Sequence, residues 1–268
     1  MVSSLKAVVF DWAGTMIDFG SCAPVEALVA AFAQEEVALT AAEARRDMGR
    51  AKRDHVRAAL AGPRIVEAWT AAKGGAPSEA DVERIYAALE PLMTEAAARH
   101  TTLIPGALAA LADARARGLK VGSNTGYTRA MMQSIIEAAA RQGYAPDAVV
   151  CAGETIEGRP TPLMLWKLWA ELGVYPAHAC VKVDDAEVGI EEGRAAGCWT
   201  VGVAASGNAV GLSLAEFEAL GADDRRLRVA AASAALSEAG AHYVVNTVAD
   251  LPGVLDAIEA RLAAGERP

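Results

Sequence analysis

The chain has 268 residues, of which 53% are hydrophobic, and its formal net charge at pH 7 is -9. This composition supports a sizeable buried core and excludes global disorder. Because the chain is acidic and contains no basic stripe, it is not typical of proteins that bind nucleic acid or anionic membranes.

The first predicted strand covers Lys6 to Phe10 and ends at Asp11, after which the sequence continues as "WAGTMID". Doubly wound sheets bind their ligands beyond the carboxyl ends of the strands. A carboxylate at this place is either a nucleophile that becomes an aspartyl phosphate or a cap of the turn that follows. The polar residues at the later strand ends bear on this choice.

From about residue 20 to residue 100 the sequence has helical periodicity and no convincing strand pattern. Three segments carry the signal: "PVEALVAAFAQEE", "TAAEARRDMGRAKRDHVRAAL" and "SEADVERIYAALEPLMTEAAARH". We expect residues 21–100 to form a helical cap domain. It would be inserted into a core made of residues 1–20 and 101–268, with links near residues 19–22 and 100–105.

The second helical segment contains Met48, Lys52 and His55, which share one face of the predicted helix because of their i, i+4, i+7 spacing. Lys52 is either one charge of a solvated basic helix or an amine that faces the site under the cap. In a closing cap, a lysine beside a methionine loses solvation, which lowers its pKa from about 10.4 toward neutrality. A neutral amine can form a Schiff base with a carbonyl substrate.

Beyond the cap, short apolar runs alternate with helical segments, which predicts βαβ units. The predicted strands are residues 119–123, 148–151, 180–184, 199–203 and 242–246. We therefore predict an α/β fold with a doubly wound, mostly parallel Rossmann-like sheet and an inserted all-helical cap. One irregular stretch, residues 205–224, is expected to be a surface excursion with a short helix.

Polar residues follow several of these strands. The Ser-Asn-Thr-Gly sequence at residues 123–126 could donate hydrogen bonds to a phosphate, or it could form an ordinary turn. Arg159 precedes a predicted helix, where a fixed cation could neutralise a phosphoryl charge or simply lie at the surface. Asp184 and Asp185 form an acidic pair, which either faces solvent or holds a cation such as Mg²⁺.

Four features follow one another along the chain: Asp11, the polar residues 123–126, Arg159 and the acidic pair at residues 184–185. In this order they resemble the haloacid dehalogenase superfamily, and the resemblance spans the whole chain. The resemblance implies that the strand before Asp11 is central in the sheet. It also implies a Mg²⁺ ion bound by Asp11, by the backbone carbonyl of Ala13 and by an aspartate of the pair, preferentially Asp185.

The rest of the metal shell is less regular in this sequence. Many members of the superfamily carry another acid a few residues after the pair, at a place where this chain has Gly189. Glu187, Asp184 or water could complete the shell instead.

Superfamily members that hydrolyse phosphate esters carry an acid two residues after the nucleophile, and this acid protonates the departing alkoxide. Such general acid catalysis contributes roughly 10²–10⁴-fold, but Ala13 cannot donate a proton. A protonated imine on Lys52 would withdraw electrons and release a carbanion equivalent as an enamine. No acid would then be needed at residue 13.

The combination of "DWAGT", "MGRAKRDHVRAAL", "SNTGYTR" and "GRPTP" resembles the phosphonatases, the carbon–phosphorus bond hydrolases of this superfamily. The resemblance implies hydrolysis of phosphonoacetaldehyde to acetaldehyde and phosphate by a homodimer joined through the caps. It implies that Asp11 attacks phosphorus and that Lys52 forms the imine. It further implies that the lysine's surroundings are shaped by Met48, His55, Cys22 and Tyr127, and that the phosphonate oxygens are held by Thr125, Gly126 and Arg159.

Two other interpretations remain open. One is a conventional phosphate-ester hydrolase or phosphomutase in which Lys52 only clamps the substrate, although no replacement acid is obvious in the first loop. The other is a decayed hydrolase that serves as a ligand-binding or regulatory dimer. The acidic pair and the lysine-bearing cap argue against a haloacid dehalogenase proper.

The cysteines and the apolar runs bear on the compartment. The four cysteines lie far apart without a CxxC pair, which indicates reduced thiols rather than a disulfide framework or a zinc site. The N-terminal run "AVVF" is too short for a signal peptide. Since no uncharged stretch reaches the roughly 18 residues of a membrane span, we expect a cytoplasmic protein.

Overall fold

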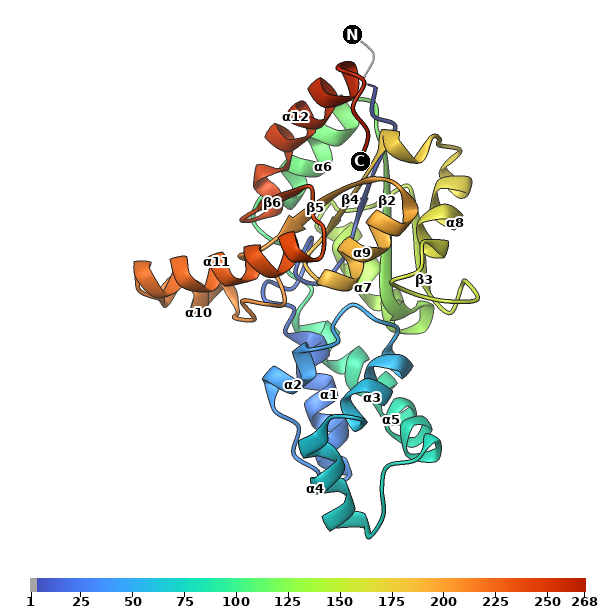
Figure 1. Cartoon of the computed structure of the whole chain (residues 1–268), viewed down its shortest axis with the longest axis vertical. Coiled ribbons are helices and arrows are strands. Elements are labelled where there is room, and N and C mark those ends of the chain that lie inside the picture. Colours follow the sequence, from blue (N-terminus) through green and yellow to red (C-terminus); the bar gives the residue numbers. More distant parts are fainter. Residues whose placement is uncertain (1–3) are drawn as a thin grey trace.

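The computed structural model describes residues 4–268 and is built around a parallel sheet of six strands (Figure 1). The strand order is β3-β2-β1-β4-β5-β6 and every neighbouring pair is parallel. The predicted α/β class is therefore confirmed, and β1 is central because it pairs with both β2 and β4. The strands are β1 (Ala7–Phe10), β2 (Lys120–Thr128), β3 (Ala148–Ala152), β4 (Cys180–Asp184), β5 (Trp199–Val203) and β6 (Tyr243–Val245).

Helices cover both faces of this sheet. Side chains of β1 alternate between the two faces, with Val8 and Phe10 in one buried cluster and Ala7 and Val9 in the other, as strand geometry requires. The first face is covered by α6 (Ala107–Ala116), α7 (Arg129–Arg141) and α12 (Leu251–Ala263), and the second by α8 (Leu163–Leu172), α9 (Glu187–Ala196) and α11 (Ala222–Glu238). No helix in residues 4–268 combines the length and the apolar character needed to cross a membrane.

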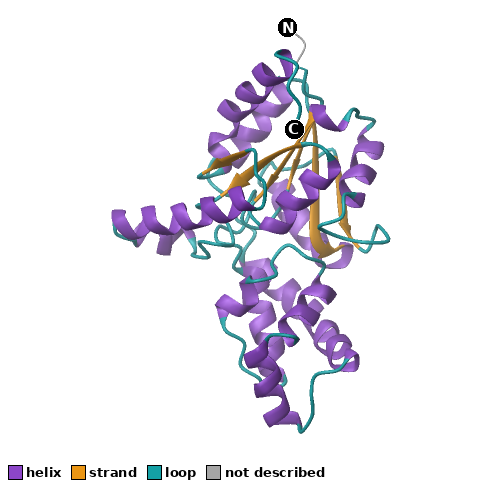
Figure 2. Cartoon of the chain, viewed as in Figure 1, coloured by secondary structure: helices purple, strands orange, loops and turns teal. Residues whose placement is uncertain are grey.

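Between β1 and β2 the chain forms a separate helical lobe, which contains no strand in its described residues 21–100 (Figure 2). Its longest helix, residues 79–99, packs along its first helix, residues 23–34, and this pair forms the centre of the lobe. This lobe corresponds to the predicted cap, while the domain boundaries at residues 20 and 100 stay predictions. Its helices are α1 (Ala23–Gln34), α2 (Ala41–Arg45), α3 (Lys52–Leu60), α4 (Pro63–Lys73) and α5 (Glu79–Arg99).

The single helix predicted over residues 40–60 is wrong. The chain leaves helical geometry after Arg45 and resumes it at Lys52, with a turn over residues 46–51 in between. Gly49 has φ +90 in this turn, a conformation that side chains rarely adopt, and a Cβ there would overlap Val188 of the core. The helix is therefore broken where the cap touches the core.

Two other segments differ from their predictions. β2 does not stop at Ser123 but continues to Thr128, with a register shift after Thr125, so residues 123–126 belong to a strand rather than a turn. The stretch 205–224 is only partly a surface excursion. Its short helix α10 (Leu214–Ala219) has no buried residue, but Ser206 and Asn208 are 0% and 5% exposed. The start of this stretch is therefore part of the interior.

His100, at the end of the cap, connects the two links between the cap and the sheet through its contacts with Asp18 and Glu26. Its Nδ1 lies 3.3 Å from Oδ1 of Asp18 in the first link, and its Nε2 lies 2.8 Å from Oε1 of Glu26 in α1. The hydrogen bond to Asp18, with the charges of both acids, raises the pKa of His100 to about 9 despite partial burial. The side chain of Asp18 also accepts hydrogen bonds from two backbone N–H groups at the start of α1.

We expect the replacement His100→Gln to lower the free energy of unfolding in a pH-dependent way. A raised folded pKa stabilises the fold fully below about pH 6.5, and this contribution disappears as the pH rises through about 9. After allowance for solvent screening, the loss at pH 6 should be about 1–2 kcal/mol. Thermal midpoints of the two proteins should differ at pH 6 and coincide at pH 10. His178, which faces no carboxylate in the described residues, provides the control His178→Gln. A difference that persists at pH 10 would contradict the assignment.

Candidate active site

Asp11 leaves β1 at the carboxyl edge of the sheet. The residue is 7% exposed, and its carboxylate pairs with the guanidinium of Arg159 across 2.9 Å. Burial, followed by the nearby Asp184 carboxylate, raises the pKa of Asp11 to about 6, while Arg159 opposes this rise. The loop after Asp11 passes so close to Asp185 that a Cβ on Gly14 would overlap the Asp185 carboxylate. Glycine at residue 14 is thus required for this close approach.

The acidic pair at the end of β4 divides into two environments. Asp184 is fully buried and lies 2.9 Å from Nζ of Lys182 and 3.4 Å from Arg159. Burial alone would raise the pKa of Asp184, but these two cations lower it overall. Asp185 instead faces the loops above the sheet, where its oxygens accept from the hydroxyl of Thr15 at 3.4 Å and from the backbone N–H of Asn208 at 2.7 Å.

These carboxylates could hold a metal ion. Asp11, Asp184 and Asp185 each offer an oxygen, and these atoms lie within 4.8 Å of one another. Burial and the charges of the other two acids raise the pKa of Asp185 well above its ordinary value. A divalent cation would relieve this repulsion, and carboxylate oxygens are the ligands that Mg²⁺ prefers. The donor set therefore fits Mg²⁺.

The residues that the sequence suggested for an outer metal shell lie differently. Glu187 begins α9 and is not one of the three converging acids among the described residues. Gly189 packs against Asp184, whose carboxylate occupies the space that a Cβ on residue 189 would need. Among the acids that the sequence offered for the outer shell, Asp184 rather than Glu187 lies beside Asp11 and Asp185, and its part in the shell stays a prediction.

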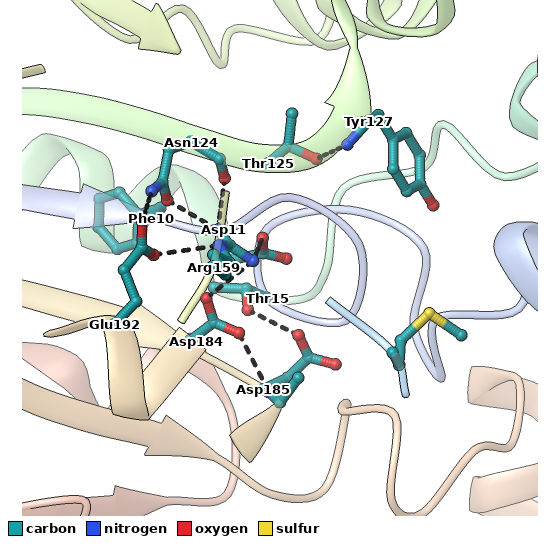
Figure 3. A network of polar contacts seen from close by, with 12 residues as sticks. Phe10, Asp11, Thr15, Asn124, Thr125, Tyr127, Arg159, Asp184, Asp185 and Glu192 are labelled. Atoms are coloured by element: carbon teal, nitrogen blue, oxygen red, sulfur yellow. Dashed lines mark hydrogen bonds and ion pairs between the residues drawn. The ribbon is translucent and has the colours of Figure 1, made fainter. Parts of the chain in front are cut away.

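A buried network lies beneath these acids (Figure 3). The Asn124 side chain accepts from Arg159 at 2.7 Å and from Lys182, and it donates to Glu192 at 2.7 Å. Glu192 also lies 3.0 Å from Nε of Arg159 and 3.7 Å from Nζ of Lys182. Buried charges of this kind are stable only when they are paired. The network holds the Arg159 guanidinium against Asp11.

Sequence reasoning missed Lys182 and Glu192. A lysine in the middle of the apolar strand "CVKVD" was the available signal, because a buried strand tolerates a charge only where a partner awaits it. The sequence left residues 123–126 as either phosphate donors or an ordinary turn, and the side chain of Asn124 instead turns toward this network. Ser123 is likewise committed elsewhere, since its hydroxyl donates to the Phe10 carbonyl at 2.7 Å. Of residues 123–126, only Thr125 and Gly126 line the cavity beside Asp11.

That cavity has a volume of about 20 Å³ and is enclosed by the sheet edge on one side and by the cap on the other. The core contributes the acids together with Ala13 and the end of β2, and the cap contributes the turn before α3 and its first residue. The lining residues are Asp11, Ala13, Ser21, Met48, Gly49, Lys52, Thr125, Gly126, Tyr127, Asp184, Asp185 and Ala186.

Lys52 enters the cavity from the cap. It is 3% exposed, and its Nζ lies 3.8 Å from Sδ of Met48 and 4.9 Å from the ring centroid of Tyr127. Burial lowers the pKa of Lys52 to about 8; Asp11 opposes this shift and Arg159 adds to it. Met48 contacts Lys52 from the turn before α3 rather than from the same helix face. The predicted neighbours are therefore together, but for a different geometric reason.

His55 lies one turn further along α3 and is 1% exposed. Its Nε2 donates to the Ala44 carbonyl at 2.8 Å, which leaves Nδ1 as an acceptor without a partner among the described residues. Burial, and then the charge of Lys52, lower the pKa of His55 to about 3. The imidazole is therefore neutral. It ties α3 to α2 through the Ala44 carbonyl and does not line the cavity.

The structure does not bring Cys22 into the cavity. Its thiol donates to the Phe19 carbonyl at 3.6 Å and lies 4.0 Å from the Arg45 guanidinium. The preceding residue, Ser21, lines the cavity and holds the left-handed φ of +49, which is costly for a residue with a side chain. The unusual backbone of the first link, which turns residue 21 rather than residue 22 inward, could not be read from the sequence.

Comparisons with known proteins agree with this geometry. Residues 5–197 match the family model of haloacid dehalogenase-like hydrolases. A curated relative from Paraburkholderia xenovorans (strain LB400), named phosphonoacetaldehyde hydrolase, is 48% identical over 264 residues, which cover 98% of this chain and 99% of the relative. One of the same name from Vibrio cholerae serotype O1 is 47% identical over 272 residues and 100% of both chains.

Solved structures extend the likeness to three dimensions. The crystal structure of a phosphonoacetaldehyde hydrolase-like protein from Oleispira antarctica has a TM-score of 0.98 and 45% identity, covering 100% of this chain and 97% of that one. A predicted phosphoglycolate phosphatase from Haemophilus somnus has a TM-score of 0.70 at 14% identity over 95% of this chain and 99% of that one, so it shares the fold alone.

Proposed function

The chain belongs to the haloacid dehalogenase-like hydrolases, among the phosphonoacetaldehyde hydrolases, and from this premise we propose that it hydrolyses phosphonoacetaldehyde to acetaldehyde and phosphate. One observation carries the proposal: a buried lysine, Lys52, reaches the same small cavity as Asp11, and the residue two positions after Asp11 is Ala13. An alkoxide leaving group would need an acid there, whereas an enamine would not.

The first step of the proposed mechanism takes place on the cap side. The neutral Lys52 amine attacks the aldehyde carbon and a carbon–nitrogen bond forms; the aldehyde oxygen takes up one proton from solvent and leaves as water, so that a protonated imine results. A pKa of about 8 makes the neutral amine far more available at neutral pH than an ordinary lysine. Met48 and the Tyr127 ring lie beside Nζ and keep water away from it.

The second step takes place on the sheet side. A carboxylate oxygen of Asp11 attacks phosphorus, the carbon–phosphorus bond breaks, and its electron pair moves into the imine to give an enamine and an aspartyl phosphate. Arg159, held beside Asp11, neutralises charge on the phosphoryl oxygens. Thr125 accepts from the backbone N–H of Tyr127 through Oγ1, which leaves its hydroxyl hydrogen for a phosphonate oxygen.

Mg²⁺ belongs to this proposal as the cofactor. Asp11, the Ala13 carbonyl and Asp185 would hold it, since Asp184 is committed to Lys182 and Arg159. When bound, the ion supplies positive charge that favours the ionised carboxylates and offsets the charge of the phosphoryl group.

The cycle closes by hydrolysis of both covalent bonds. Water attacks phosphorus and releases phosphate from Asp11, while the enamine gains a proton on carbon and becomes an imine again. Water then cleaves this imine, which frees acetaldehyde and the Lys52 amine. The buried hydroxyl of Tyr127 has no hydrogen-bond partner among the described residues and is suitably placed to hold a water or the substrate. His55 would act through water because it does not line the cavity.

The proposal includes two further predictions from the sequence, a cytoplasmic location and a homodimer joined through the cap helices. Both are independent of the chemistry at the site. The dimer can be tested by light scattering, and a monomer of full activity would remove it from the proposal.

Gly126 limits how closely the cap approaches the sheet. A Cβ on this residue would overlap the carbonyl oxygens of residues 49–50, so the variant Gly126→Ala should push the turn before Lys52 outward. A displacement of about 1 Å can cost 10²-fold in rate, and we expect kcat/KM for phosphonoacetaldehyde to fall by about that factor. Gly158→Ala is the control, because its Cβ would make an ordinary 3.7 Å contact with Ala51. Equal activities of the two variants would show that cap approach does not limit the reaction.

The proposed function is tested directly by product analysis. Purified enzyme with phosphonoacetaldehyde and Mg²⁺ should release acetaldehyde and phosphate in equal amounts, and removal of Mg²⁺ should stop the release. A generic phosphate ester, such as p-nitrophenyl phosphate, should be hydrolysed far more slowly. Rapid hydrolysis of such esters without release of acetaldehyde would instead favour a conventional phosphate-ester hydrolase.

A further inference from the structure

The segment after β5, residues 204–212, connects several parts of the site, and we call it the junction loop. Its Ser206 hydroxyl donates to the Gly14 carbonyl at 2.7 Å, and the Ser206 carbonyl accepts from the backbone N–H of Gly20 at 2.7 Å. The next contact reaches the acidic pair, where the backbone N–H of Asn208 donates to Asp185 at 2.7 Å. The junction loop therefore touches the nucleophile loop, the first link and Asp185.

Arg45, the last residue of α2, holds the same loop from the cap. Its guanidinium donates to Oδ1 of Asn208 at 3.1 Å, to the Gly211 carbonyl at 3.0 Å and to the Gly20 carbonyl of the first link at 2.7 Å. In return, Nδ2 of Asn208 donates to the Arg45 carbonyl at 3.0 Å. Arginine suits this place, because its planar group presents several donors in a fixed geometry.

These parts also fit too tightly to move separately. A Cβ on Gly211 would overlap the Arg45 guanidinium, and a Cβ on Gly20 would overlap the Leu212 carbonyl. Packed contacts of this density transmit a shift of one element to the next. A movement of α2 away from the sheet must therefore either break the Arg45 contacts or pull on the junction loop.

We propose that Arg45 and Asn208 form a latch through which the closed cap sets the position of Asp185. Asn208 is the shared element, since its side chain bonds the cap while its backbone N–H bonds the Asp185 carboxylate. Closing the cap thus brings Lys52 to the substrate and fixes Asp185 in the same motion. The latch rests on the proposed function, in which Asp185 is a metal ligand, and Arg45 and Asn208 are positioning residues.

The test measures Mg²⁺ binding to the substrate-free protein by calorimetry. Asn208→Ala removes both side-chain bonds of the latch but keeps the backbone N–H on Asp185, and Arg45→Met removes the donors from the cap. Loss of a residue that orients a metal ligand costs 10–100-fold in affinity, and we expect the Mg²⁺ dissociation constant to rise about 10-fold in each variant. The exposed neighbour Arg46, whose side chain makes no hydrogen bond or ion pair within residues 4–268, provides the control Arg46→Met.

The double variant decides whether the two residues act as one unit. In a latch, the Arg45→Met and Asn208→Ala effects do not multiply, so the double variant should bind Mg²⁺ about as weakly as either single variant. Turnover offers a second readout: kcat/KM should fall about 10²-fold in Arg45→Met, and Arg45→Lys should restore part of it.

Unchanged Mg²⁺ affinity in both single variants, effects that multiply, or an equal loss in Arg46→Met would overturn the latch. Should Arg45→Met fail to fold, Asn208→Ala carries the same test. The outcome is separable from the proposed function. A wild-type protein that releases no acetaldehyde refutes the reaction, whereas the calorimetric comparison still decides the coupling between cap and Asp185.

Discussion

Replacing Lys52 with arginine is expected to reduce kcat for phosphonoacetaldehyde by about 10⁴-fold or more, the order of loss seen when a covalent nucleophile is removed. Arginine keeps the positive charge but stays protonated at every accessible pH, so it cannot attack an aldehyde. In the wild-type enzyme, kcat/KM should rise with pH through about 8 as the Lys52 amine loses its proton. This rise should be absent from the residual activity of the variant.

Borohydride trapping supplies the chemical proof. Wild-type enzyme treated with substrate and borohydride should carry a reduced adduct on Lys52, detectable by peptide mass spectrometry, and Lys52→Arg should carry none. Lys73→Arg is a matched control in α4, where the lysine pairs with Glu35 at the cap surface, and it should retain activity and adduct. If Lys52→Arg keeps most of its activity, Lys52 is a substrate clamp and the imine mechanism fails.

The replacement Asp11→Asn should abolish turnover to a similar degree, with a loss of about 10⁴-fold or more. An amide cannot form the acyl phosphate, although it preserves the size of the side chain beside Arg159. The imine step does not use Asp11, so phosphonoacetaldehyde and borohydride should still label Lys52 in this variant. The combination of no product and a retained adduct separates the two halves of the proposed mechanism.

Two controls accompany this experiment. Asp113→Asn removes a carboxylate that pairs with Arg117 on the surface of the core, away from the cavity. This variant should leave kcat unchanged. A thermal melt of Asp11→Asn checks the fold, because Arg159 keeps the acids Asp184 and Glu192 as partners. Turnover that survives in Asp11→Asn would remove the aspartyl phosphate from the mechanism.

The sheet could be predicted because its strands are buried on both faces. Residues 180–184 and 199–203 agree with β4 and β5 to the residue, since continuous apolar runs between helical segments have few other interpretations. β2 was cut short at Ser123 because the pattern treats Asn124 and Thr125 as turn residues. Their polar groups are instead buried, one in the Arg159 network and one at the cavity, which no local pattern reveals.

The cap was harder to predict in detail. The periodicity of residues 40–60 continues through the turn at 46–51, and what interrupts the helix is the contact of Gly49 with Val188, about 140 residues away in the chain. The sequence still identified Lys52 and Met48 as neighbours, because a turn and a helix both bring residues four apart close together. The two residues are thus neighbours as predicted, but they do not lie on one face of a single helix.

The site divides in the same way. Asp11, Thr125, Arg159 and Asp185 were predicted from strand ends and residue chemistry, and Lys52 from the face of a cap helix. The structure brings all five to one place, while their roles stay predictions. Ser206 and Asn208 were missed because they are ordinary loop residues until the junction loop folds against Gly14 and Asp185. Contacts between distant segments decide such roles, and a single sequence contains no record of them.

The charged network under the cavity also restricts how this sequence can change over generations. Lys182 and Glu192 are both fully buried. Loss of Lys182 would leave Asp184 and Glu192 with Arg159 as their only remaining cation among these contacts, and an uncompensated buried charge of this kind costs about 3–5 kcal/mol. That amount is a large part of the roughly 5–15 kcal/mol by which a domain is stable. A replacement of Lys182 is therefore expected to be tolerated only together with a change at one of these acids, so the residues below the cavity should change together while the loops above it vary more freely.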